Sequence, residues 1–435
     1  MRSLSAEFSR VAVICGAIIA TSASTAAEPA APAAVNFSKH IAPIFQKRCQ
    51  TCHRPGETAP MALLSYADAR PHADSIKDEV AGRRMPPWHA DPKYGRFKND
   101  PTLTQEEVDT IQAWVDGGAV EGDPKDLPPP IKFTDGWRLG TPDAIFTMEE
   151  EFKVPATGEV KYQYFEIPTH FAEDRWIRAV EARPGNRAVV HHILVFHLDP
   201  VEGEPRGGKK GLARFKGNIF NVYLAGAVPG GEPAVFPEGT GRRIKAGSSL
   251  VFQMHYTPNG KETTDRSQVG LFLSKEPPKT ELVTRAVLNQ LFVIPPGAQA
   301  FDVGSEYTFR KESKVLSFMP HMHLRGKSFQ YMATYPDGST KTLLSVPRYD
   351  FSWQHTYYLE EPLDFPAGTK IRCVGTFDNS AGNKHNPDPK TFVRWGDQTW
   401  EEMMIGFVTF TREMPDKDSQ SESKSGSEGD RRRKL

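Results

Sequence analysis

The spacing of apolar residues divides the chain into a short helical part and a long β-rich part. Between about residues 36 and 123, apolar side chains recur at intervals of three and four, as in 36–49, which is typical of amphipathic helices. A middle helix is predicted to start near Ser65. A last helix is predicted to start at the capping box of Thr104 and Glu107 and to end at two consecutive glycines. The region 36–123 is therefore predicted to be a small helical domain.

After a Pro-rich linker, 124–133, apolar and polar residues alternate in short runs separated by Gly, Pro and Asp. Such runs are typical of β-strands joined by turns. The clearest runs are 161–168, 175–184, 188–198, 249–258, 313–324 and 401–410. The number of runs predicts two β-sandwiches, 134–290 and 291–412. The whole chain is expected to be mainly β with one small α domain.

The two ends of the chain are predicted to lie outside this fold. Arg2 and Arg10 precede a short apolar stretch, and small residues near Ala27 offer a cleavage site. Residues 1–27 therefore predict a signal peptide, with an uncleaved membrane anchor as the alternative. The stretch is short for a stable membrane span, so the mature protein is expected in the periplasm or outside a bacterial cell. The polar tail 416–435 is expected to be disordered.

Charge and cysteine content narrow the class of protein. Lys and Arg number 54 and so do Asp and Glu, which gives no electrostatic reason to expect a nucleic-acid partner. Cys15 leaves with the signal, so Cys49, Cys52 and Cys373 remain. An exported chain with so few cysteines has no disulfide framework. Its core, and its cofactors if it has any, must hold it together.

The stretch Cys49-Gln-Thr-Cys-His53 is a Cys-x-x-Cys-His motif. Cys49 and Cys52 at this spacing can bond both vinyl groups of one haem, and His53 can reach the iron from the same turn. A redox dithiol would need a thioredoxin-like context, and a zinc site would need two further ligands. The motif predicts one covalently attached haem c.

The second axial ligand of this haem is expected later in the helical domain. Met85 precedes two prolines, and Met61 and His89 are the alternatives. Ligation by Met and His raises the reduction potential. Residues 36–123 resemble a class I cytochrome c, in which a Met-Pro follows the middle helix and a Trp-bearing helix ends the fold. The resemblance points to Met85.

Two adjacent histidines, His191 and His192, interrupt an apolar strand, and His255 lies in another strand-like stretch. Three imidazoles without a thiolate suit copper or zinc. Successive side chains of a regular strand point to opposite faces. If both adjacent histidines bind one ion, the strand must be irregular at this point.

A second group of candidate ligands follows. His321 and His323 are two residues apart, so a strand would place both on one face, and Pro320 indicates a strand end or edge. Met403 and Met404 occur near the end of the β-rich part. A thioether favours copper(I), although most methionines fill cores. Alternation turns one of the two inward and the other outward.

Together these motifs resemble the copper type II, ascorbate-dependent monooxygenases, the family of peptidylglycine alpha-hydroxylating monooxygenase and dopamine beta-monooxygenase. The resemblance covers about 134–412 and rests on the order of Val190-His-His-Ile, Gln253-Met-His-Tyr, His321-Met-His-Leu-Arg-Gly and Glu401-Glu-Met-Met. It implies two jelly-roll-like sandwiches that hold two copper ions. It implies that His191, His192 and His255 bind one copper, and that His321, His323 and Met403 bind the second, catalytic copper.

The resemblance implies hydroxylation of a C–H bond of a small organic substrate with O2. The family takes its electrons from ascorbate. Here the preceding haem domain is hypothesised to supply them, itself reduced by an ascorbate-like reductant or a redox protein. The alternative is a non-catalytic protein that binds haem and copper for electron transfer or sensing.

The sequence departs from the family at several positions. The peptide-hydroxylating members carry an Arg where this chain has Met319, and an Asn and a Tyr where it has Ile405 and Phe407. A peptide carboxylate is therefore not the expected substrate group, and an apolar or neutral substrate is favoured. Met404 stands where a cysteine often occurs, which leaves Cys373 without a partner.

Overall fold

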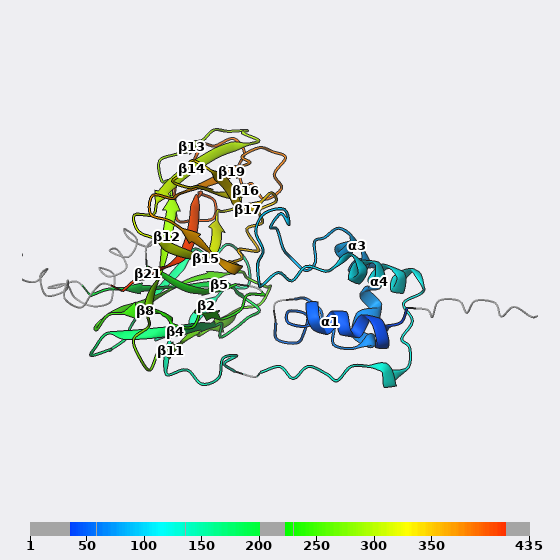
Figure 1. The fold of residues 1–435 in the computed structure, drawn as a ribbon. Coiled ribbons are helices and arrows are strands. Elements are labelled where there is room, and N and C mark those ends of the chain that lie inside the picture. Colours follow the sequence, from blue (N-terminus) through cyan, green and yellow to red (C-terminus); the bar gives the residue numbers. More distant parts are fainter. Residues whose placement is uncertain (1–34, 58, 135, 201–221, 229, 415–435) are drawn as a thin grey trace, which may run out of the picture.

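The computed structural model describes residues 35–57, 59–134, 136–200, 222–228 and 230–414. The predicted signal peptide and tail lie outside these residues. Within them the protein is mainly β, with a few helices near its N-terminal end (Figure 1). No helix among the described residues has the length and apolar character needed to cross a membrane.

The helices form one small unit with its own core. They are η1 (Phe37–Ile41), α1 (Ala42–Arg48), α2 (Tyr66–Ala69), η2 (Arg70–His72), α3 (Ala73–Ala81), α4 (Gln105–Asp116) and η3 (Pro124–Asp126). The predicted capping box of Thr104 and Glu107 starts α4. A second box at Ser65 starts the middle helix, which Pro71 divides with a 3-10 turn. Trp114 is fully buried at the centre of this unit.

The β-rich part contains one long sheet and two four-stranded sheets. The long sheet consists of β1 (Ala144–Thr147), β11 (Gln268–Leu273), β4 (Arg175–Arg183), β8 (Thr240–Ile244), β12 (Thr280–Leu288), β21 (Ile405–Glu413), β15 (Ser313–His321) and β18 (Tyr357–Phe365) in that order, with β7 (Ala234–Val235) paired to β4. The first four-stranded sheet is β3 (Gln163–Pro168), β9 (Ser249–Tyr256), β5 (Val190–Leu198) and β6 (Tyr223–Ala227). The second is β14 (Phe301–Thr308), β19 (Lys370–Phe377), β16 (Gly326–Thr334) and β17 (Thr340–Val346).

Two short ribbons complete the strands. They are β2 (Phe152–Val154) with β10 (Thr263–Asp265), and β13 (Val293–Ile294) with β20 (Val393–Arg394).

Each four-stranded sheet packs on one half of the long sheet and encloses a core. Ile193 and Phe252 belong to the first core, and Phe318 and Tyr331 to the second. Such pairs of packed sheets are β-sandwiches. The long sheet is shared, because β12 pairs with β21 along its whole length and also touches β8. The boundary predicted near residue 290 thus falls just after a strand that joins the two halves.

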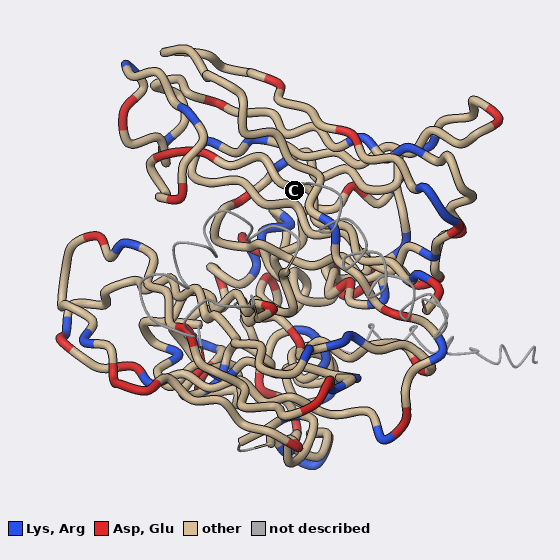
Figure 2. The backbone as a smooth tube through the Cα atoms, turned by 90° about the vertical axis from the view of Figure 1, so that its left-hand side faces the viewer, with Lys and Arg blue, Asp and Glu red and all other residues tan. Residues whose placement is uncertain are grey.

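The helical unit contacts both sandwiches. Phe97 forms a β-bridge with Leu359 of the second sandwich, and the amide of Asp91 donates to the carbonyl of Ser345. On the first sandwich, Arg187 forms an ion pair with Glu57 at 3.0 Å. Acidic and basic residues are interspersed along the backbone (Figure 2), which agrees with the balanced charge of the chain.

Candidate metal centres

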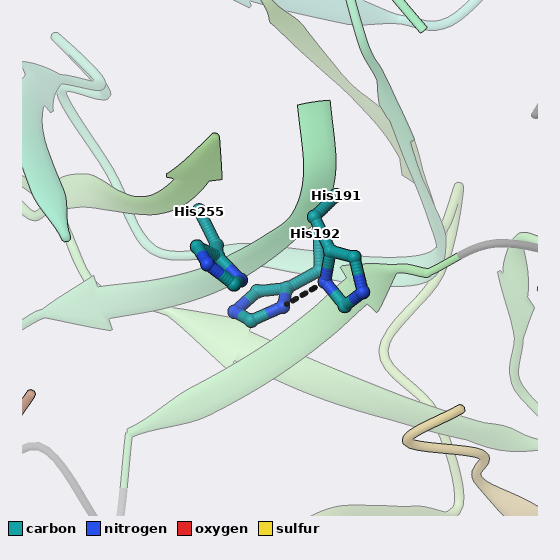
Figure 3. A group of neighbouring side chains, drawn as sticks. All are labelled: His191, His192 and His255. Carbon is teal, nitrogen blue, oxygen red and sulfur yellow. Dashed lines mark hydrogen bonds between the residues drawn. The ribbon is translucent and has the colours of Figure 1, made fainter. Parts of the chain in front are cut away.

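The first histidine cluster lies on two paired strands of the first sandwich. His192 on β5 is directly opposite His255 on β9, and the pairing slips between Val190 and His192. His191 is therefore the additional residue of a β-bulge, which turns its ring toward the other two (Figure 3). One ring nitrogen from each of the three histidines lies within 4.8 Å of the others. The expected irregularity is present, and the three rings are together.

Two ring nitrogens of this cluster lack the partners that buried polar atoms usually have. Nε2 of His192 and Nδ1 of His255 are buried without a hydrogen bond to any described residue. Nδ1 of His191 and Nδ1 of His192 are 3.2 Å apart, and two nitrogens each about 2 Å from one ion have such a spacing. Burial, together with nearby His191, lowers the pKa of His255 to about 3. Neutral imidazoles with free nitrogens fit a bound metal ion.

The second cluster lies at the end of β15 in the second sandwich. The rings of His321 and His323 are 5.3 Å apart, and Pro320 lies at the strand end, as predicted, where the pairing with β18 has already stopped. Nδ1 of His321 is 2.6 Å from Oε1 of Gln354. Nδ1 of His323 is 3.1 Å from the carbonyl oxygen of Glu401. Both rings therefore keep Nε2 available, and Nε2 of His323 has no hydrogen bond within the described chain.

Burial keeps both rings of the second cluster neutral. It lowers the pKa of His321 to about 4, although the hydrogen bond to Gln354 opposes this. Burial and nearby His321 together lower the pKa of His323 to about 3, although the hydrogen bond to the carbonyl of Glu401 opposes this. A metal ion can bind these nitrogens near pH 7 without displacing a proton.

The two adjacent methionines lie in different apolar clusters, but neither points outward as alternation predicted, because both are buried. Met404 is fully buried in the second core, with Phe318. Met403 belongs to an apolar cluster with Met319 and Ile405, and Ile405 is directly opposite His321 in the β15–β21 pairing. Opposed residues of a pair share one face of the sheet. Met403 is therefore on the His321 face and Met404 is not.

A buried carboxylate joins the two segments of the second cluster. Glu402, which precedes Met403, accepts the backbone amides of His323 at 2.8 Å and Arg325 at 2.6 Å. Burial raises the pKa of Glu402 to about 8, while these amides and the Arg325 guanidinium oppose the rise. Arg325 is itself held by Asn379 at 2.8 Å. These hydrogen bonds hold the segment that carries Met403 beside the segment that carries His321 and His323.

Two aromatic rings lie between the clusters. The ring of Tyr162 is 5.1 Å from that of His255 and 6.3 Å from that of His323. Phe351 stacks on His191 at 6.0 Å and is also 6.0 Å from His323. The first cluster and the second cluster therefore face each other across the contact between the sandwiches.

The Cys-x-x-Cys-His motif forms a compact turn after α1. The amide of His53 donates to the carbonyl of Cys49 at 2.9 Å, so Cys49, Cys52 and His53 lie together, and both thiols are free. Nδ1 of His53 is 3.2 Å from the carbonyl of Met61, which leaves Nε2 for a ligand. Burial raises the pKa of Cys49 to about 12. This arrangement fits thioether attachment of a haem.

The candidates for the second haem ligand lie beyond α3. The amide of Met85 donates to the carbonyl of Glu79. His89 is close to Asp350 and Arg348 of the second sandwich, and burial lowers its pKa. Met85 as the axial ligand stays a prediction, with Met61 and His89 as the alternatives.

Sequence reasoning did not find the residues that support the histidines. Tyr162, Phe351 and Gln354 carry no motif and reach the site only through long-range contacts. For Glu402 the sequence offered one weak indication, because this residue belongs to the acidic pair that precedes Met403.

Comparisons with known proteins do not show a family for this chain. No protein-family model matches it, and neither does any curated protein. Among solved structures, that of infectious bursal disease virus Gx strain is 9% identical with a TM-score of 0.19, covering 66% of this chain and 76% of the other. Allantoicase from Saccharomyces cerevisiae is 8% identical with a TM-score of 0.17, covering 52% and 80%. These scores support no inference about fold or function.

Proposed function

We propose that this protein is an exported copper-dependent monooxygenase that hydroxylates a C–H bond of a small organic substrate with O2, with electrons supplied through a fused c-type haem. One observation carries the proposal. Five histidines from three separate segments of the chain converge as two facing clusters, and buried ring nitrogens in both are without partners among the described residues. A bound metal ion would give these buried nitrogens the partner that they lack.

The donor sets favour copper over other metals. His191, His192 and His255 would hold one ion with three imidazole nitrogens. His321 and His323 would hold the second with two, and Met403 would add a thioether, which suits copper(I) better than zinc. When bound, the two copper ions supply the two electrons that hydroxylation with O2 consumes. Gln354 and Glu401 orient the imidazoles of the second site.

The surroundings of Met403 support an apolar or neutral substrate. Met319, Ile405 and Phe407 are each at most 4% exposed and pack in one cluster with Met403. A substrate near this face would meet methylene groups and an aromatic ring. Burying a charged substrate group against them would be costly.

The helical unit would hold the haem. Cys49 and Cys52 would form the two thioether bonds, His53 would offer Nε2, and Met85 would be the second axial ligand. When bound, the haem supplies a one-electron carrier in front of the copper centres. An ascorbate-like reductant or a redox protein would reduce it outside the cytoplasm.

The test is O2 uptake by reduced, copper-loaded protein with a panel of small neutral substrates. We expect substrate-dependent uptake and a hydroxylated product, both lost in Met403→Ile. Met404→Ile is the matched control, because it makes the same change one residue away in the second core and should keep activity. Equal uptake by Met403→Ile would contradict the assignment of the thioether. No uptake with any substrate would favour a non-catalytic role in electron transfer or sensing.

A further inference from the structure

The helical unit and the second copper cluster are connected by a continuous set of contacts. Trp88 follows Met85 by three residues and is 7% exposed in the second core. Its ring is 5.6 Å from that of His355. His355 is bonded through the backbone to Gln354, whose Oε1 is 2.6 Å from Nδ1 of His321. Between Met85 and His321 this path has two non-covalent steps, the ring contact between Trp88 and His355 and the hydrogen bond between Gln354 and His321.

The segment that carries Trp88 is held firmly against the second sandwich. The side-chain amide of Asn99 donates to the carbonyl of Thr356 at 2.8 Å and accepts the amide of Tyr358 at 3.1 Å. The ring of Trp88 is also 4.7 Å from that of Tyr357. The ring contact therefore lies inside a packed interface. Burial lowers the pKa of His355 to about 4, so this ring is neutral near pH 7.

We propose that Trp88, His355 and Gln354 form the route by which electrons pass from the haem end of the helical unit to the His321–His323 cluster. The inference rests on the proposed function and specifies which of the two copper sites receives the electron. In each transfer one electron leaves the haem iron, which changes from Fe(II) to Fe(III), and one bound Cu(II) becomes Cu(I). No bond forms or breaks, and the side chains of the route keep their protons.

A second contact offers a competing route. Glu57, close to the Cys-x-x-Cys-His motif, forms an ion pair with Arg187 at 3.0 Å. Arg187 precedes His191 by four residues. A Cβ on Gly230 of the first sandwich would be 3.3 Å from Sγ of Cys52. This route leads to the first cluster, but it crosses an ion pair in which the Arg187 side chain is 36% exposed. The route through Trp88 is buried and ends on a ligand ring, which is why we favour it.

The test is flash reduction of the haem in fully oxidised, copper-loaded protein without O2 or substrate, followed by its reoxidation in the visible spectrum. We expect reoxidation in wild type only when copper is bound. We expect it to slow several-fold in Trp88→Leu and His355→Leu. Trp176→Leu, on β4 of the first sandwich, is the matched control and should behave as wild type, as should Arg187→Met. Haem absorbance and the copper electron paramagnetic resonance signal should be unchanged in all four variants.

Two variants on one route keep the test decisive if one of them does not fold. Wild-type rates in both Trp88→Leu and His355→Leu would overturn the inference, as would slowing confined to Arg187→Met. Oxygen uptake driven by ascorbate added directly to the coppers separates the two proposals. If O2 uptake persists and the rate of haem reoxidation is unchanged in Trp88→Leu and His355→Leu, only the route is overturned. Failure of the wild-type chain to bind copper overturns the proposed function, and the route with it.

Discussion

The hydrogen bond between Gln354 and His321 predicts how tightly the second copper is held. Gln354 is 3% exposed, and its Oε1 accepts the Nδ1 proton of His321 at 2.6 Å. This contact fixes the tautomer that leaves Nε2 free for metal. Replacing Gln354 with Met keeps the approximate size and removes the acceptor. Loss of such a partner typically lowers metal affinity by about 10- to 100-fold, which is about 1.4 to 2.7 kcal/mol.

The measurement is competition of the copper-free protein with a chromophoric copper(I) chelator, analysed for two sites. We expect the weaker binding at one site only, because the first cluster does not contact Gln354. Gln354→Glu keeps an acceptor and should hold copper at least as tightly as wild type. Gln268→Met, on β11 of the first sandwich, controls for loss of a glutamine side chain. Unchanged affinity at both sites in Gln354→Met would refute the reasoning.

Three further outcomes follow from the same geometry. Above about pH 8, where the Glu402 carboxyl group is ionised and accepts both backbone amides, Glu402→Gln leaves one amide facing an amide donor, so the free energy of unfolding should fall by about 1–3 kcal/mol in denaturant titration; an unchanged midpoint would contradict the stabilising role of Glu402. The pKa values of His255 and His323 are about 3 when folded and about 6.5 when unfolded. Copper-free protein should thus lose about 1.4 kcal/mol per pH unit for each as pH falls from 6.5 toward 3, and a flat pH profile would contradict this. Cys49→Ser with Cys52→Ser should make haem extractable by acid solvent, whereas retained haem would refute thioether attachment.

Much of the fold was readable from local pattern. The helix starts at Ser65 and Thr104 were predictable because a capping box is a contact between residues three apart. The strands carrying His191 and His255 were predictable from their apolar runs. The bulge was predictable too, because two adjacent rings can reach one ion only if the pleat is broken.

The rest depends on contacts between distant segments. No local pattern indicates that β12 pairs with β21, more than a hundred residues away, and so joins the two sandwiches through one sheet. Trp88 falls within the predicted helical domain, 36–123, yet it packs in the second core against Tyr357. Phe351 and Gln354 lie in an irregular segment without periodicity. Their roles follow only from the rings they touch.

The copper and haem content of the purified protein tests the central claim most directly. Protein made in copper-replete cells with an active pathway for covalent haem attachment is analysed for metals and for haem. We expect two copper ions and one covalent haem per chain, and one copper with unchanged haem in His255→Ala. Zinc in the first cluster, or a copper content that His255→Ala does not lower, would contradict the account.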